Sequence, residues 1–217
     1  MPLLRFDGFV AHTTVATSSS VINQNQQQNQ FLIARMNVSF IIKNVHKTKT
    51  LDAGSIKVHV NLGKINNRGS LRGQDIIVEK HLPFSLQPNE EQRIYFPWSH
   101  FPELILTEDP PLWWPWQMGA QPLFNATVGF NGHPVENWRY GIRSSESRFT
   151  RDGAYQLYIN NVFINIRGGG YDPDLFMRID DEKTLIDEIS MIRSMGLNAV
   201  RMEGMMMSEK FYDQLDE

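Results

Sequence analysis

The 217-residue sequence contains no cysteine, which excludes disulfides, thiol nucleophiles, iron–sulfur clusters and cysteine-rich zinc sites. It has no apolar run of about 20 residues, the length that a membrane-spanning helix needs, so no membrane partner is expected. It also has no basic excess, because Lys+Arg 21 against Asp+Glu 24 leaves a formal net charge of -3. Nucleic acid is therefore not expected as a partner.

The N-terminal segment 1–14 lacks a charged stretch followed by a long apolar one, so the chain shows no secretory signal. A secreted or lysosome-like location remains compatible with a full-length protein. No metal site is expected, because the histidines show no metal-ligand spacing and all precede residue 134, at positions 12, 46, 59, 81, 100 and 133. The later part of the chain thus has no base for a Ser-His-Asp hydrolase site.

The first part of the chain has the pattern of an antiparallel β-sandwich. Residues 32–40 alternate, with Leu32, Ala34, Met36, Val38 and Phe40 on one face. Several further short strands follow with turns between them, among them an Asn-Gly turn at 131–132. We therefore predict an immunoglobulin-like sandwich over residues 1–143. Within it, the amide-rich stretch at 17–30 is expected to form a mobile surface loop.

The second part, residues 144–217, has an α/β pattern. A hairpin around Asn160-Asn161 leads into three glycines at 168–170, and a helix, a buried strand at 197–202 and a second helix capped by Ser208 follow. Two βα units cannot cover both faces of a parallel sheet. The pattern is therefore that of an unfinished α/β domain, completed by further chain or by a partner.

The first of these helices is predicted from its apolar spacing. Leu185, Ile189 and Ile192 recur at i, i+4 and i+7, and Ile186 is assigned to the same arc. Asp180 is expected to be the N-cap. Gly196 is expected just past the C-terminal end.

Candidate site residues follow the two strands, because active sites of parallel α/β folds lie at the carboxyl ends of their strands. Tyr171, Asp172 and Asp174 follow the first strand, and Glu203 follows the second. Together they predict an acidic rim suited to sugar hydroxyls or to an ammonium group. The alternative is that the acids are turn residues or solvated loop charges.

Arg201 lies inside the strand predicted to be buried, where an unpaired guanidinium would be costly, so a carboxylate is expected beside it. It forms either a structural salt bridge or a contact that orients a catalytic carboxylate. The tryptophan-rich segment 112–119 fits either packing or stacking on sugar rings. Two N-x-S/T triplets, Asn37-Val38-Ser39 and Asn125-Ala126-Thr127, permit N-glycosylation in a secretory route.

Five motifs in this order resemble glycoside hydrolase family 2: WWPWQMG, YGIRSSE, INNVFINIRGGGY, RGGGYDPDLFMR and MGLNAVRMEG. Within the family they are most similar to the exo-β-D-glucosaminidases that trim chitosan oligosaccharides. Plant endo-β-mannosidases and β-mannosidases are near relatives. The resemblance implies that residues 144–217 are the N-terminal part of a (β/α)8 barrel and that the ligand is a chitosan-like or mannoside oligosaccharide.

The same resemblance implies roles for single residues. Arg201 matches the arginine near the nucleophile, while Asp174 and Glu203 match acidic positions of the amino-sugar subsite, with Tyr171 beside them. The two catalytic glutamates of the implied retaining mechanism lie on later barrel strands, so this chain is expected to contain neither. The implied mechanism needs no cofactor. The alternatives are a β-mannosidase-type enzyme and a non-catalytic carbohydrate-binding remnant.

Overall fold

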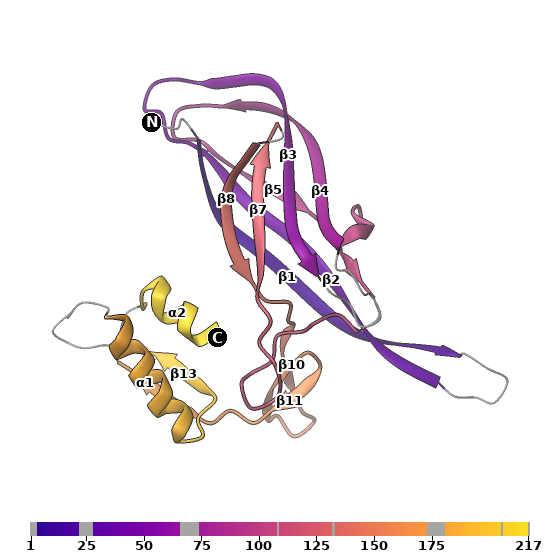
Figure 1. The fold of residues 1–217 in the computed structure, drawn as a ribbon, viewed down its shortest axis with the longest axis vertical. Coiled ribbons are helices and arrows are strands. Elements are labelled where there is room, and N and C mark those ends of the chain that lie inside the picture. The colour runs from indigo at the N-terminus through magenta and orange to yellow at the C-terminus, as the bar shows by residue number, and fades with distance from the viewer. Residues whose placement is uncertain are drawn as a thin grey trace. The chain divides into compact units, whose positions relative to one another are not determined.

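The computed structural model describes residues 4–21, 28–65, 74–107, 109–131, 133–172, 181–204 and 206–216. The chain forms two compact units (Figure 1). Unit 1 comprises Met1–Leu112 and Pro122–Ser144, and unit 2 comprises Trp113–Gln121 and Ser145–Glu217. The tryptophan-rich segment is thus grouped with unit 2, whereas the sequence-based division placed it in the first domain.

Unit 1 contains two four-stranded antiparallel sheets. The first consists of β1 (Leu4–Val21), β2 (Gln28–Asn44), β5 (Glu91–Phe96) and β6 (Ile105–Leu106), with β2 pairing with the other three. The second has the order β4-β3-β7-β8, formed by β4 (Gln74–Leu86), β3 (Leu51–Ile65), β7 (Phe124–Phe130) and β8 (His133–Tyr140). A short 3-10 helix, η1, spans Pro102–Leu104. The predicted antiparallel β structure is confirmed; the immunoglobulin type stays a prediction.

The core of unit 1 follows from the alternation read in the sequence. On β2, Ala34, Met36, Val38 and Phe40 are fully buried, as the period of a half-buried strand requires. Aromatic rings then join the two sheets, since Phe6 of β1 stacks on a ring of β7 at 6.0 Å between centroids. Burial of these faces against each other is what holds the sheets together.

The amide-rich segment departs from its prediction. Residues 17–21 belong to β1 and residues 28–30 belong to β2, and the two strands pair as far as Val21 with Gln28. The loop prediction for 17–30 is therefore wrong at both ends, and residues 22–27 lie outside the described part of the chain. Ladder hydrogen bonds involve only the backbone, so polar residues can continue a hairpin that apolar residues begin. The sequence analysis also missed β1 itself.

The β7–β8 hairpin is confirmed, with Asn131 at a φ of 49° in its turn. At the far end of β8, the buried Tyr140 hydroxyl donates a hydrogen bond to the Leu62 carbonyl at 2.9 Å. Burial also raises the pKa of the Tyr140 hydroxyl well above its ordinary value of 10.0. The hydroxyl therefore remains a donor over the whole working range of pH.

Unit 2 contains a three-stranded antiparallel sheet and a two-stranded parallel one. The first has β10 (Tyr155–Ile159) between β9 (Ser145–Phe149) and β11 (Val162–Ile164). The predicted hairpin around Asn160-Asn161 is confirmed as the β10–β11 turn, in which both asparagines have positive φ values. The second pairs β12 (Gly168–Tyr171) with β13 (Ala199–Met202). Helix α1 (Glu182–Ser194) connects these two strands, and α2 (Glu209–Asp216) follows β13.

Helix α1 matches the prediction in position and differs in detail. Its N-cap is Asp181, whose side chain accepts from the Thr184 amide; Asp180 lies outside the described residues. Leu185 and Ile189 are buried, whereas Ile186 is 42% exposed. The assignment of Ile186 to the apolar arc is wrong, because one residue turns the helix by about 100° away from Leu185. None of the described helices is long and apolar enough to cross a membrane.

Helix α2 begins where the sequence predicted, yet without the predicted side-chain cap. The Ser208 carbonyl accepts from the amides of Phe211 and Tyr212. The Ser208 hydroxyl is buried and makes no hydrogen bond to the described residues. The predicted cap by this side chain is therefore wrong.

Candidate functional site

The candidate site is the carboxyl end of the parallel pair β12–β13. The pair is closed at this end by the Glu203 amide, which donates to the Tyr171 carbonyl at 3.0 Å. At the opposite end the Asn198 amide donates to the Arg167 carbonyl at 2.9 Å, and Asn198 Oδ1 accepts from the Arg167 amide at the same distance. Parallel register therefore brings Tyr171 and Glu203, far apart in sequence, to one edge.

The three glycines and Tyr171 form strand β12 itself, whereas Tyr171 was predicted to follow the strand. Close backbone approach explains two of them. A Cβ atom at Gly168 would overlap the Ala199 carbonyl oxygen, and one at Gly170 would overlap the Glu203 carboxylate. Nothing lies within 4 Å of a Cβ built at Gly169. The strand thus needs glycine at position 168, where the overlap is with backbone, while a side chain at position 170 would displace the Glu203 carboxylate.

Glu203 and Arg201 lie on one face of β13 and form an ion pair, Arg201 Nη2 to Glu203 Oε1. Gly170 pairs with Arg201 across the sheet, which is why the Glu203 carboxylate lies over that glycine. The expected carboxylate beside Arg201 is thus present. It comes from the same strand, two residues on, where side chains return to the same face.

The expectation that Arg201 is buried is wrong for the described part of the chain. Its side chain is 78% exposed, and that of Glu203 is 45% exposed. Helices α1 and α2 pack against the other face of β13, through Val200 and Met202. No described element covers the face with the ion pair, so both charges remain in contact with solvent.

Tyr171 points away from the ion pair. Its ring packs at 4.9 Å between centroids on Phe211, in the cluster formed by Leu185 and Ile189 beneath the helices. Its hydroxyl hydrogen-bonds Glu188 Oε2 of α1. The structure therefore brings Arg201 and Glu203 together and places the Tyr171 side chain on the opposite face.

The other predicted rim residues are Asp172 and Asp174. Asp172 follows β12 and is exposed, and Asp174 lies outside the described residues. Glu188 was missed by the sequence analysis. The sequence could have revealed Glu188, because its carboxylate lies between Leu185 and Ile189 on the apolar arc of α1. A polar residue in that position needs a hydrogen-bond partner.

The tryptophan-rich segment binds the end of the parallel pair opposite to the candidate site. Trp116 Nε1 donates to the Leu197 carbonyl at 3.0 Å, and Gln117 Nε2 donates to the Gly196 carbonyl at 3.1 Å. Trp113 is buried, and its Nε1 donates to the Asp216 carbonyl at 2.9 Å. These contacts favour the packing alternative for this segment over stacking on a sugar.

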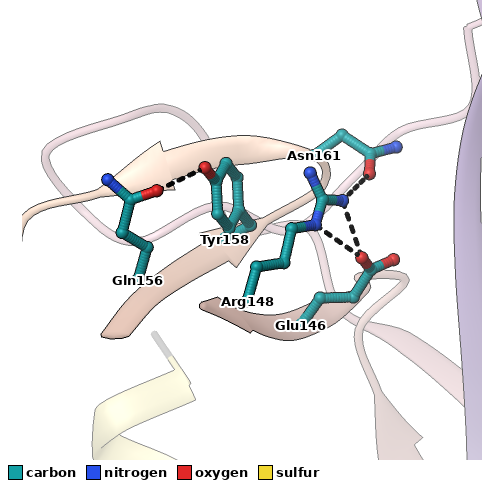
Figure 2. A network of polar contacts seen from close by, with 5 residues as sticks. All are labelled: Glu146, Arg148, Gln156, Tyr158 and Asn161. Carbon is teal, nitrogen blue, oxygen red and sulfur yellow. Dashed lines mark hydrogen bonds and ion pairs between the residues drawn. The ribbon is translucent and has the colours of Figure 1, made fainter. Parts of the chain in front are cut away.

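A polar network lies on one face of the β9–β11 sheet (Figure 2). Arg148 donates to Glu146 Oε2 at 2.7 Å, and this bond raises the pKa of the guanidinium. Arg148 also donates to Asn161 Oδ1 at 3.0 Å. Its Cζ lies 4.2 Å from the centroid of the Tyr158 ring, whose hydroxyl donates to Gln156 Oε1 at 2.8 Å. The Arg148 guanidinium occupies one face of the Tyr158 ring. We therefore assign the network to stabilising the β9–β11 sheet.

No metal cluster marks the rim among the described residues. An apolar cavity of about 410 Å³ lies in unit 1, lined by Phe6, Phe84 and Phe130 among others. None of the predicted site residues lines it. No group of three or more histidine, aspartate or glutamate side chains in the described ranges is placed to hold a metal ion.

Known proteins with similar sequences are glycosidases. The chain is 32% identical to the exo-beta-D-glucosaminidase of Amycolatopsis orientalis over 137 residues, which are 61% of this chain and 13% of that protein. It is 29% identical to the Arthroderma benhamiae exo-beta-D-glucosaminidase over 168 residues, 72% of this chain and 18% of that protein. It is 28% identical to the mannosylglycoprotein endo-beta-mannosidase of Lilium longiflorum over 155 residues, 67% of this chain and 16% of that protein.

Solved structures share the fold over almost the full chain. The exo-chitosanase of Amycolatopsis orientalis superposes with a TM-score of 0.63 at 24% identity, over 99% of this chain and 22% of that one. Its structural neighbours are members of glycoside hydrolase family 2. A glycosyl hydrolase family 2 member from Bacteroides cellulosilyticus superposes with a TM-score of 0.62 at 18% identity, over 98% of this chain and 25% of that one.

No family model matches the chain. The chain also spans only 13% to 18% of the length of the three relatives named above. The similarity to these glycosidases therefore concerns a small part of each relative.

Proposed function

We propose that this chain is part of a retaining glycoside hydrolase that releases glucosamine from the ends of chitosan oligosaccharides. The observation that carries the proposal is the Arg201–Glu203 pair at the carboxyl end of β13, on the face away from the helices. Similarity to exo-beta-D-glucosaminidases over 61% to 72% of the chain supports the choice of sugar.

Strand alternation supports the proposal that β12 and β13 are the first strands of a (β/α)8 barrel. In such a barrel, alternate side chains of each strand face the interior and the others face the surrounding helices. Val200 and Met202 pack against α1 and α2, so Arg201 and Glu203 have the orientation of interior residues. Residues 144–217 would then be the N-terminal part of that barrel, and residues 1–143 the sandwich that precedes it.

The proposed role of Glu203 is to bind the ammonium group of glucosamine. A carboxylate at the strand end, next to solvent, can exchange its ion pair with Arg201 for one with a cationic ligand. It favours an amino sugar over a neutral one, because only the former brings a positive charge. Asp174 is proposed to act beside it, on the resemblance alone.

Arg201 is proposed to orient the catalytic nucleophile, and this role too rests on the resemblance. In a retaining mechanism one carboxylic acid protonates the leaving oxygen, and a carboxylate about 5 Å away attacks the anomeric carbon. We place both of these glutamates on later barrel strands. The residues in this chain then bind and orient, and perform no covalent step.

A β-mannosidase-type enzyme is the second candidate. The similarity to the Lilium longiflorum endo-beta-mannosidase, at 28% identity over 67% of this chain, favours it. A neutral mannoside offers no cation to Glu203. The two candidates therefore differ in what removal of this carboxylate does to activity.

The deciding experiment begins with the full-length transcript. If the reading frame continues into later barrel strands with two glutamates, the encoded enzyme is assayed on aryl β-glucosaminide and aryl β-mannoside. Glu203→Gln and Asp174→Asn are expected to lower kcat/KM at least tenfold on the glucosaminide only. Glu182→Gln, which alters an exposed carboxylate in the first turn of α1, is the matched control and should leave both activities unchanged.

Equal losses on both sugars in Glu203→Gln would favour the mannosidase candidate. A frame that ends at Glu217 with a stably folded product would instead support a non-catalytic carbohydrate-binding protein. The 217-residue chain itself is expected to show no hydrolysis above background. Retaining hydrolysis by the purified chain would overturn the proposal that both catalytic glutamates lie on later barrel strands.

A further inference from the structure

Unit 1 contains two N-x-S/T triplets, and their surroundings differ. Asn37-Val38-Ser39 lies in β2, and Asn125-Ala126-Thr127 lies in β7. Such triplets accept N-linked glycans in a secretory route when the asparagine lies at the surface. We infer that Asn125 is a glycan acceptor site in the folded protein and that Asn37 is not.

Asn125 is exposed on the outer face of its sheet. Ala126 and Val128 are fully buried, so alternation directs Asn125 and Thr127 outward. On the β8 side, Asn125 pairs with Arg139, which is also exposed. A sugar chain attached here extends over a polar surface and covers none of the core.

On the β3 side, the neighbour of Asn125 is a glycine. The pairing between β3 and β7 ends at Asn61 with Thr127, two residues past Asn125. Gly63 then lies beside the Asn125 backbone, so close that a Cβ would be 2.9 Å from the Asn125 carbonyl oxygen. Because position 63 has no side chain, nothing projects from it toward the acceptor asparagine.

Asn37 is confined by its neighbours. It pairs with His12 of β1, and the adjacent Val38 pairs with Phe96 of β5. The Asn37 side chain is half-buried, and its Oδ1 accepts from the Trp98 amide at 3.3 Å. A glycan on this side chain would have to displace that contact.

The Trp98 side chain adds to the crowding around Asn37. Arg35, two residues before Asn37 on the same face of β2, places its guanidinium 5.3 Å from the Trp98 ring centroid. Ser39, two residues after, is 8% exposed and accepts from Arg93 Nη1 at 3.2 Å. The side chains of Arg35 and Ser39, on either side of Asn37, therefore both make contacts within this sheet.

The test uses the full chain fused to a cleavable secretion signal and expressed in a eukaryotic host. Secreted protein is compared by gel mobility before and after endoglycosidase, and mass spectrometry of peptides identifies the occupied asparagine. We expect one glycan, lost in Asn125→Gln and unchanged in Asn37→Gln. An unshifted wild-type band, or a glycan on Asn37 in the secreted fraction, would overturn the inference.

Variants at the hydroxyl positions keep the test decisive if an asparagine variant is not secreted. Thr127→Ala should abolish the shift, while Thr127→Ser keeps a valid triplet and should retain it. Ser39→Ala should leave the shift unchanged. The readout involves no catalysis, so its outcome is independent of the proposed glycosidase function.

Discussion

The carboxylate of Glu203 lies over Gly170, in the space that a side chain at position 170 would occupy. A glycine on one strand thus decides where the acidic group of the next strand can lie. The relationship links the RGGGY and NAVRMEG segments physically, because the first leaves open the place that the second fills. It also shows why a run of glycines can form a strand here, in spite of the entropy that glycine loses on folding.

The three glycines should respond differently to alanine. Gly168→Ala places a methyl group against the Ala199 backbone and is expected to destabilise the chain by about 3 kcal/mol through loss of β12–β13 pairing. Gly170→Ala meets a movable side chain, so it should cost about 1 kcal/mol and displace Glu203 from Arg201. Denaturant unfolding measures both free energies.

Gly169→Ala is the matched control for this series. Open space surrounds a Cβ at this position, and the expected change is within about 0.5 kcal/mol. Equal effects at all three positions would contradict the placement of the glycines in β12.

The Arg201–Glu203 pair should contribute little to stability. With side chains 78% and 45% exposed, the pair is screened by water, and a double-mutant cycle with Arg201→Gln and Glu203→Gln should give a coupling below about 1 kcal/mol. Unfolding of the two single variants and the double variant measures it. A coupling of several kcal/mol would assign the pair a structural role and weaken the proposed role in binding.

Tyr171→Phe should destabilise unit 2 by about 2 kcal/mol. The change removes the hydroxyl that bonds the half-buried Glu188 and keeps the ring on Phe211, so the loss reports the hydrogen bond rather than the packing. Thermal unfolding measures it. Tyr212→Phe is the control, because among the described residues the Tyr212 hydroxyl donates only to a sulfur atom, Met206 Sδ at 3.8 Å. Equal losses of stability in both variants would argue against a special role for Glu188.

The stability of the β9–β10 turn should depend on pH through the Asp152 carboxyl. The Thr150 hydroxyl donates to this carboxylate and lowers its pKa below the ordinary value of 3.8. A lowered pKa in the folded state means that the contribution is fully present above pH 3.8 and is lost as the pH falls through the lower value. A titration of the Asp152 carboxyl followed by NMR measures the pKa directly.

Thr150→Val is the control for that titration. Removing the hydroxyl donor should return the Asp152 pKa toward its ordinary value. An unchanged titration in this variant would mean that the backbone of the turn, and not Thr150, sets the pKa.

Local patterns in the sequence determined much of this structure. The alternation at 32–40 identified the buried face of β2, and Leu185 and Ile189 identified the buried face of α1. The Asn160-Asn161 pair located the β10–β11 turn, since both residues have positive φ values there. These features depend on neighbours within a few residues, which is the range over which side-chain period and turn chemistry act.

Tertiary structure alone decided the site. That the glycines form β12, that the Glu203 carboxylate lies over Gly170 and that Tyr171 faces α1 all follow from pairing between strands about thirty residues apart. The sequence predicted a carboxylate beside Arg201, and only the structure identified it as Glu203. Exposure of this pair likewise depends on which elements cover β13, and no period within the strand can reveal that.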